Sequence, residues 1–328
     1  MITRRGFILA SGIGALALRG GSLLAQQPAQ QPAQQPMQTR DRFVLLGTKG
    51  GPFVSAYAPA PSCNLLVRRG VAHVIDAGYG VTFKLIEAGV PPAQVRHVFI
   101  THHHSDHNIE LGPLLYNAWA TGLKDRIGVY GPAGLVALLN AYWESNRFDI
   151  ETRIADEGRP DPRPLVVAHE YGEGLVLENA ELRVTALRNR HPPVTESFAL
   201  KLEFDGKTIV FSGDTTHFPP LAEFARDADY LIHEVMYAPA MAAVVRRTAN
   251  GATLLEHLKA SHTLPADVGR VAAAAHVKTL VLNHLVPPTG FVFDGTTLTA
   301  EMWIAAVRAT FDGPIIVGRD LLELPLEP

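Results

Sequence analysis

One short stretch constrains this chain more than any other: VFITHHHSDH, residues 98–107, in which an apolar run leads directly into a dense polar cluster. The apolar run predicts a buried strand, and a strand end can present side chains into a cleft. On extended backbone His102 and His104 face one side while His103 faces away, and Asp106 and His107 follow in the turn. Burying such a cluster without partners is costly. The stretch therefore predicts a metal site, with a solvated loop as the alternative.

Similar residues recur where later predicted strands end or helices begin, so their side chains can converge on one rim of the fold. Four of them are His191, Asp214, His262 and His284. The only cysteine is Cys63, which we interpret as a small core residue, so a metal must be held by histidines and carboxylates. We expect the other histidines to be structural or solvated: His73, His97, His169, His217, His233, His257 and His276.

The periodicity along the chain predicts an α/β protein. Hydrophobic residues make up 47% of the 328 residues, enough for a large core. Predicted strands lie at 42–48, 63–69, 72–78, 95–101, 127–132, 182–188, 197–204, 207–213, 229–235, 279–284 and 314–318, and predicted helices at 82–90, 109–123, 133–146, near 219–227, before 275 and near 300–311. A polar segment, 147–163, is interpreted as an excursion from the core. Two halves of similar make-up suggest two sheets packed face to face with helices outside.

The N-terminus has the pattern of an export signal. Residues 1–25 combine Arg4 and Arg5 with a weakly apolar run and resemble a twin-arginine signal peptide; an uncleaved amphipathic anchor is the alternative. Residues 26–39 are a Gln/Pro-rich linker, and the folded domain is predicted to span 40–328. We expect a periplasmic or secreted protein without stable membrane insertion after signal removal. Loss of the signal takes the net charge from −3 to −6, which disfavours nucleic-acid binding.

The order of these residues resembles that of the metallo-β-lactamase superfamily from about residue 40 onward. The resemblance implies a four-layer αββα sandwich with two Zn²⁺ ions per chain, and other divalent metals are the alternative. It assigns His102, His104 and His191 to the first metal and Asp106, His107 and His284 to the second, with Asp214 bridging. A metal-bridging hydroxide would then attack the substrate, while Asp106 holds its proton.

Further motifs indicate which branch of the superfamily the chain resembles. LIHEVMY and KASHT resemble the ribonuclease Z-like branch, which implies that Glu234 orients His262 and that His262 protonates the leaving group. GTKGGP, VFITHHHSDHN, DEGRP, IVFSGDT and IIVGRDLLEL are similar to zinc-dependent arylsulfatases within that branch. The resemblance implies hydrolysis of aryl sulfates or related phosphodiesters. Lys49 could neutralise the substrate, and Phe291 or Phe293 could flank its aryl group.

Three alternatives remain beside this small-molecule esterase. The first is a dizinc lactonase or thioesterase. The second is a ribonuclease Z-type tRNA endonuclease, which is disfavoured because residues 144–173 carry eight acids against four arginines, and because Glu110 stands where that enzyme has glycine. The third is a non-catalytic metal-binding protein, disfavoured because every ligand position and the Glu234/His262 pair are intact. The oligomeric state is left open between a monomer and a homodimer.

Overall fold

The strands of this protein are apolar along most of their length because both of their faces are buried. In the first strand, β1 (Arg42–Gly47), Val44 and Leu46 face helices, whereas Phe43 and Leu45 face a second sheet. A strand covered on both sides reads as a continuous apolar run rather than an alternating one. The computed structural model describes residues 40–56 and 58–326, which belong to one compact unit. The predicted signal peptide (1–25) and linker (26–39) lie outside the described residues.

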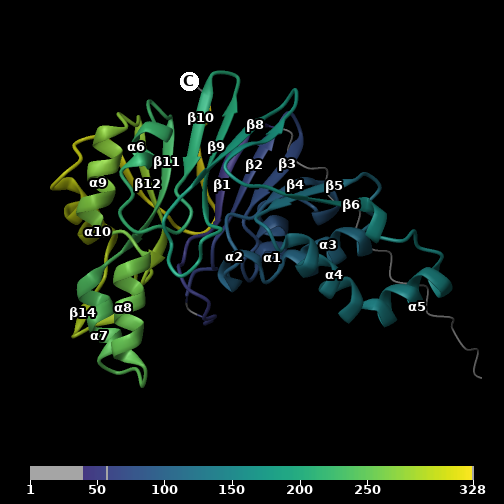
Figure 1. Cartoon of the computed structure of the whole chain (residues 1–328), viewed down its shortest axis with the longest axis horizontal. Coiled ribbons are helices and arrows are strands. Elements are labelled where there is room, and N and C mark those ends of the chain that lie inside the picture. Colours follow the sequence, from purple (N-terminus) through teal and green to yellow (C-terminus); the bar gives the residue numbers. More distant parts are fainter. Residues whose placement is uncertain (1–39, 57, 327–328) are drawn as a thin grey trace, which may run out of the picture. The chain divides into compact units, whose positions relative to one another are not determined.

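The first sheet has seven strands in the order β16-β1-β2-β3-β4-β5-β6 (Figure 1). Pairing is antiparallel from β16 to β3 and parallel from β3 to β6. The remaining strands of this sheet are β2 (Cys63–Arg68), β3 (Val71–Ile75), β4 (Val95–Phe99), β5 (Ile127–Gly131), β6 (Val166–Glu170) and β16 (Leu322–Leu324).

The second sheet repeats this plan in the order β15-β12-β11-β10-β9-β8-β7. It is antiparallel from β7 to β10 and parallel from β10 to β15. Its strands are β7 (Gly174–Glu178), β8 (Arg183–Arg188), β9 (Phe198–Phe204), β10 (Lys207–Phe211), β11 (Tyr230–Met236), β12 (Thr279–Val286) and β15 (Ile315–Val317). A small hairpin pairs β13 (Val292–Phe293) with β14 (Thr296–Thr297).

Helices cover the outer face of each sheet. On the first sheet lie α1 (Val81–Glu87), α2 (Ser105–Asn108), α3 (Leu111–Ala120), α4 (Leu135–Ser145) and α5 (Arg147–Glu157), with 3₁₀ turns at Pro92–Gln94 and Arg163–Leu165. On the second lie α6 (Pro220–Phe224), α9 (Pro265–Ala274) and α10 (Ala300–Arg308). A hairpin of α7 (Ala238–Val245) and α8 (Gly251–Ser261) sits apart from these helices in Figure 1.

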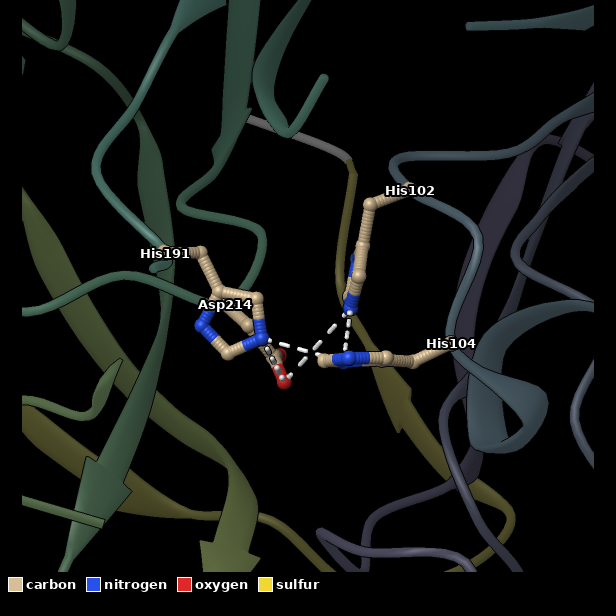
Figure 2. A group of neighbouring side chains, drawn as sticks. All are labelled: His102, His104, His191 and Asp214. Carbon is tan, nitrogen blue, oxygen red and sulfur yellow. Dashed lines mark hydrogen bonds and ion pairs between the residues drawn. The ribbon is translucent and has the colours of Figure 1, made fainter. Parts of the chain in front are cut away.

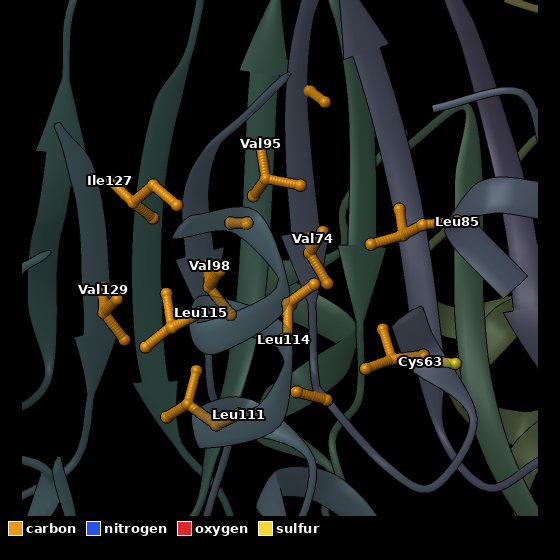
Figure 3. Packing of buried hydrophobic residues seen from close by; sticks show 14 of the residues in the cluster. Cys63, Val74, Leu85, Val95, Val98, Leu111, Leu114, Leu115, Ile127 and Val129 are labelled. Atoms are coloured by element: carbon orange, nitrogen blue, oxygen red, sulfur yellow. The ribbon is translucent and has the colours of Figure 1, made fainter. Parts of the chain in front are cut away.

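Three apolar cores hold the layers together. Figure 3 shows the first, in which Leu111, Leu114 and Leu115 of α3 pack onto Val98 and Val129 of the sheet. The spacing of three and four residues places these leucines on one helix face. A second core lies between the other sheet and its helices, and a third lies between the two sheets. The predicted four-layer αββα sandwich is confirmed.

The structure corrects several details of the predicted elements. Strands β6, β7 and β16 were not predicted, and the burial of β6 and β7 explains why, since neither has a fully buried face to mark it. The segment 147–163, which was interpreted as an excursion from the core, contains α5, whose Ile150 is buried in the first core. Within the described part of the chain, none of the helices combines the length and apolarity that crossing a bilayer requires.

The core between the sheets gives a test of stability. Leu202 on β9 is fully buried there, so Leu202→Ala should lower the free energy of unfolding by about 2–5 kcal/mol through lost packing and a residual cavity. Urea denaturation followed by circular dichroism measures the change. Leu175→Ala on β7, where the side chain is 56% exposed, is the matched control and should change stability by less than about 1 kcal/mol. Equal losses in the two variants would contradict the assignment of the inter-sheet core.

Candidate metal centre and active site

Parallel strands bring the polar residues together, because their carboxyl ends share one edge of the sheet. His102 and His104 follow β4, Asp214 follows β10, and His284 lies near the end of β12. All seven predicted ligands meet at this edge, as do Glu234 and His262. Six of these nine residues border a cavity of about 190 Å³, which is lined by Gly51, Pro52, His104, Ser105, Asp106, His191, Asp214, His257, His262 and His284.

The first cluster contains three imidazoles and one carboxylate (Figure 2). Nδ1 of His104 lies 3.1 Å from Nε2 of His102 and 3.1 Å from Nε2 of His191. Oδ2 of Asp214 lies 3.9 Å from each of these two Nε2 atoms. The four donor atoms are all within 4.8 Å of one another, so one metal ion could contact them together.

The second cluster shares Asp214 with the first and adds Asp106, His107 and His284. Nε2 of His284 lies 3.3 Å from Oδ2 of Asp106 and 3.2 Å from Oδ2 of Asp214. Nε2 of His107 lies 3.3 Å from Oδ1 of Asp214. Asp214 therefore faces both clusters, as the bridging position requires.

Hydrogen bonds behind the clusters orient two of the rings. Nδ1 of His191 donates to the backbone carbonyl of Ser261 (3.0 Å), and Nδ1 of His107 donates to Oδ2 of Asp76 (2.8 Å). Asp76 also accepts from the backbone N–H of Thr101 (2.8 Å). Each ring therefore turns its Nε2 towards the cluster, which is how metal-binding histidines are commonly held.

The charges at this edge fit a bound cation. Burial opposes protonation of His107, but Asp214, Asp76 and Asp106 outweigh it and raise the pKa of this imidazole well above its ordinary value. Its Nε2 is buried and has no hydrogen-bond partner among the described residues. Burial is the main cause that lowers the pKa of His191 to about 4, so that ring is neutral and can act as a ligand. Imidazole and carboxylate donors of this kind suit zinc.

The two carboxylates of the clusters are ionised at neutral pH. Burial would raise the pKa of Asp106, but His107 and His284 lower it far below its ordinary value. The same two imidazoles overcome burial at Asp214. Oδ2 of Asp106 also accepts the backbone N–H of Gly51 at 2.8 Å. Ionised carboxylates can only accept hydrogen bonds, so both are available to a metal ion or to a water molecule.

Beside the second cluster, Glu234 and His262 form a separate buried pair. Oε2 of Glu234 accepts from Nδ1 of His262 at 3.3 Å, while Oε1 accepts the backbone N–H groups of Thr263 (2.9 Å) and Thr215 (3.3 Å). Burial opposes the charge on His262, but Glu234 and two further carboxylates raise its pKa to about 9. With its oxygens already engaged, Glu234 is better placed to hold a protonated His262 than to bind a metal.

His284 owes its position to an irregularity in β12. Glu234 pairs with Asn283 and Val235 pairs with Leu285, which leaves His284 as an extra, unpaired residue with φ 43°. Such a bulge re-aims a side chain. Gly50 packs directly against the ring and against Val286: a Cβ at this position would lie 2.7 Å from Nδ1 of His284 and 2.4 Å from Cγ2 of Val286.

Gly50→Ala should therefore displace His284 and weaken zinc binding by about tenfold or more, the usual range for changes that disturb the support of a ligand. Competition with a chromophoric chelator measures the affinity. Gly172→Ala is the matched control, because a Cβ there meets no atom within 4 Å. Wild-type zinc affinity in Gly50→Ala, with the fold retained, would contradict this role of the glycine.

Other predicted site residues lie elsewhere. His103 points away from the clusters, as expected, with Nε2 3.2 Å from the carbonyl of Pro132. Lys49 does not reach the cavity: it is fully buried and its ammonium donates to the carbonyls of Gly50 and Gly51. Neither Phe291 nor Phe293 is among the lining residues. Backbone carbonyls engage the lysine, and Phe293 packs against the second core. Substrate contact by any of the three residues stays a prediction.

Two residues at this edge were not predicted to belong to the site. Asp76 directly follows the apolar strand β3, and an acid in that place was a usable signal. His257 was interpreted as structural or solvated, yet it lines the cavity. Its signal was the spacing of four residues to Ser261, which places both on one face of α8.

Comparison with known proteins agrees with this architecture. Residues 42–264 match the family described as anti-Pycsar protein Apyc1. Ribonuclease Z of Mycobacterium bovis (strain BCG) is 30% identical over 288 residues, which cover 87% of this chain and 98% of that protein.

Solved structures share the fold. The metallo-β-lactamase fold protein YhfI from Bacillus subtilis superposes with a TM-score of 0.64 at 20% identity, covering 87% of this chain and 98% of that one. Zn²⁺-bound PqqB from Methylobacterium extorquens gives 0.62 at 14% identity, covering 87% and 100%. Together with the clusters described above, these similarities show that the chain belongs to the anti-Pycsar protein Apyc1 family and is a ribonuclease Z-like, metal-dependent hydrolase of the metallo-β-lactamase fold.

Proposed function

We propose that this protein hydrolyses small phosphodiesters or sulfate esters, and that His262 donates a proton to the oxygen that leaves. The observation that carries the proposal is the Glu234–His262 pair beside the second cluster. Because Nδ1 of His262 is engaged by Glu234, Nε2 is the ring nitrogen left for a substrate. A positioned acid of this kind assists an alkoxide or phenoxide that leaves poorly by itself.

The other residues of the edge divide the remaining tasks. Zinc ions bound at the two clusters would lower the pKa of water and neutralise the anionic centre of the ester. We assign His102, His104 and His191 to one ion and Asp106, His107 and His284 to the other, with Asp214 between them. As an ionised acceptor, Asp106 can take a hydrogen bond from the attacking water. Glu234 stabilises the protonated form of His262, which then donates its proton to the leaving oxygen.

Two considerations decide the substrate class: the chemistry that the two kinds of ester share, and the names of the similar proteins. Phosphodiesters and sulfate monoesters share a singly charged tetrahedral centre and a leaving oxygen, so the pair can serve either. The 30% identical relatives carry the name ribonuclease Z, which denotes cleavage of RNA. This favours phosphodiesters as the first class to test, with aryl sulfates as the second.

A small substrate suits the surface better than RNA does. All four arginines of residues 147–163 contact carboxylates: Arg147 with Glu144, Arg153 with Asp149 and Glu157, Arg159 with Glu157, and Arg163 with Asp161. Phosphate contacts dominate nucleic-acid affinity, and cations that are already paired contribute little to them. Export by the predicted signal, residues 1–25, would likewise separate the protein from cytoplasmic RNA.

The leaving-group dependence tests the proposed acid. His262→Ala should lower kcat on methyl phenyl phosphate by about 10²–10⁴-fold, the usual contribution of general acid catalysis. It should spare methyl 4-nitrophenyl phosphate within a few fold, because nitrophenolate leaves without a proton. The corresponding phenyl and 4-nitrophenyl sulfates extend the comparison, and zinc content is measured for each protein.

His169→Ala, at an exposed position on β6, is the control and should leave both rates unchanged. Equal losses of His262→Ala on both esters, with zinc retained, would rule out the proton donor. Activity of the wild type confined to lactones or thioesters would instead reject the substrate class.

The pH dependence gives a second test. The pKa of His262 is raised to about 9, so its acid form is present below that pH and is lost as the pH rises through it. We expect kcat on methyl phenyl phosphate to fall above about pH 9. In Glu234→Gln the main influence that raises this pKa is gone, so the fall should begin at lower pH. An alkaline limb at the same pH in both proteins would contradict the pairing.

A further inference from the structure

His257 lies at the same cavity but belongs to neither metal cluster nor to the acid pair. Its ring packs edge-on against His191, with centroids 6.4 Å apart, and against His262, with centroids 6.2 Å apart. It is therefore held between a residue of the first cluster and the proposed proton donor. A polar side chain in this place faces whatever occupies the cavity.

The hydrogen bonds of Ser261 fix which nitrogen of His257 carries the proton. The Ser261 hydroxyl donates to the carbonyl of Pro192 at 2.6 Å, a distance that requires the proton between the two oxygens. A hydroxyl has only one proton, so Ser261 Oγ can only accept from Nδ1 of His257, which lies 3.2 Å away. Nδ1 is thus the protonated nitrogen, and Nε2 of the neutral ring carries a lone pair.

This tautomer decides what His257 can bind. Nε2 has no hydrogen-bond partner among the described residues, and in the neutral ring it can only accept. The oxygens of an ionised phosphodiester or sulfate ester also only accept, so His257 cannot bind the anionic centre itself. Its partner must be a donor elsewhere on the substrate. A site built to bond a hydroxyl group discriminates against analogues that lack it.

We propose that Nε2 of His257 accepts a hydrogen bond from a hydroxyl group of the substrate, so that the enzyme prefers esters of sugars or other polyols to simple alkyl or aryl esters. The inference rests on the proposed function and sharpens its substrate class. His257 acts as a specificity-determining residue, while the clusters and the acid pair act on the ester.

Two matched esters test the proposal at pH 8, above the ordinary pKa of histidine: the 4-nitrophenyl ester of glycerol phosphate and the 4-nitrophenyl ester of propyl phosphate. After subtraction of the rate without protein, wild-type kcat/KM should favour the glycerol ester by about tenfold, the value of one hydrogen bond. In His257→Phe this ratio should fall to about one. His257→Gln, which keeps an acceptor, should retain part of it. Zinc content and Tm confirm that each variant is folded and loaded.

Equal losses of His257→Phe on both esters, or an unchanged ratio, would overturn the assignment. If the wild type hydrolyses neither ester, a binding measurement decides the inference separately, and the proposed function itself fails only if the methyl phenyl phosphates and the aryl sulfates are not hydrolysed either. Calorimetry would then compare glycerol 3-phosphate with propyl phosphate on the zinc-loaded protein. Tighter binding of glycerol 3-phosphate, lost in His257→Phe, supports the role of His257, whereas equal binding overturns it.

Discussion

Buried negative charge at one sheet edge is the constraint on which the rest of this structure depends. Asp76, Asp106 and Asp214 are each almost inaccessible to solvent, and a buried ionised carboxylate is costly unless it is paired. Imidazoles provide the pairing: the single ring of His107 forms ion pairs with all three aspartates. A metal ion must displace the proton from such a ring, so metal binding and protonation compete for the same site. The apolar cores on both faces of the sheets keep these charges in contact.

Different parts of the fold supply the two metal clusters and the residues His257 and His262, which are proposed to face the substrate. Strand ends, the turns after them and the short helix α2 carry the clusters. The hairpin of α7 and α8 carries His257 and leads into His262, and a small apolar cluster around Met236, Leu258 and Val286 holds it. Ser261 joins the two sides, because its carbonyl orients His191 and its hydroxyl orients His257. One residue thereby sets both a ring of the metal cluster and a ring that faces the substrate.

Much of this architecture could be predicted because its signals are local. The period of two along a strand places His102 and His104 together and turns His103 away, and the doubly apolar strands indicate covered sheets. Asp76 and His257 were missed because their local signals, a place directly after a strand and a spacing of four residues to Ser261, do not show which side chains pack around them. Lys49 was assigned to the substrate from its motif, but whether a lysine reaches a cavity depends on the backbone carbonyls that surround it.

By itself, the sequence determined the fold class and the metal-binding residue types, because each follows from a pattern that lies within a few residues. The pairing of Glu234 with His262 was implied by the resemblance to the ribonuclease Z-like branch. Only the tertiary structure decided how His284 enters the site. Its bulge exists because β12 slips by one residue against β11, and Gly50 from a distant loop leaves room for the ring. The tautomer of His257 was decided in the same way, because the Pro192 carbonyl accepts the hydrogen bond of the Ser261 hydroxyl. Both depend on atoms far apart in the chain, whose distances no local pattern encodes.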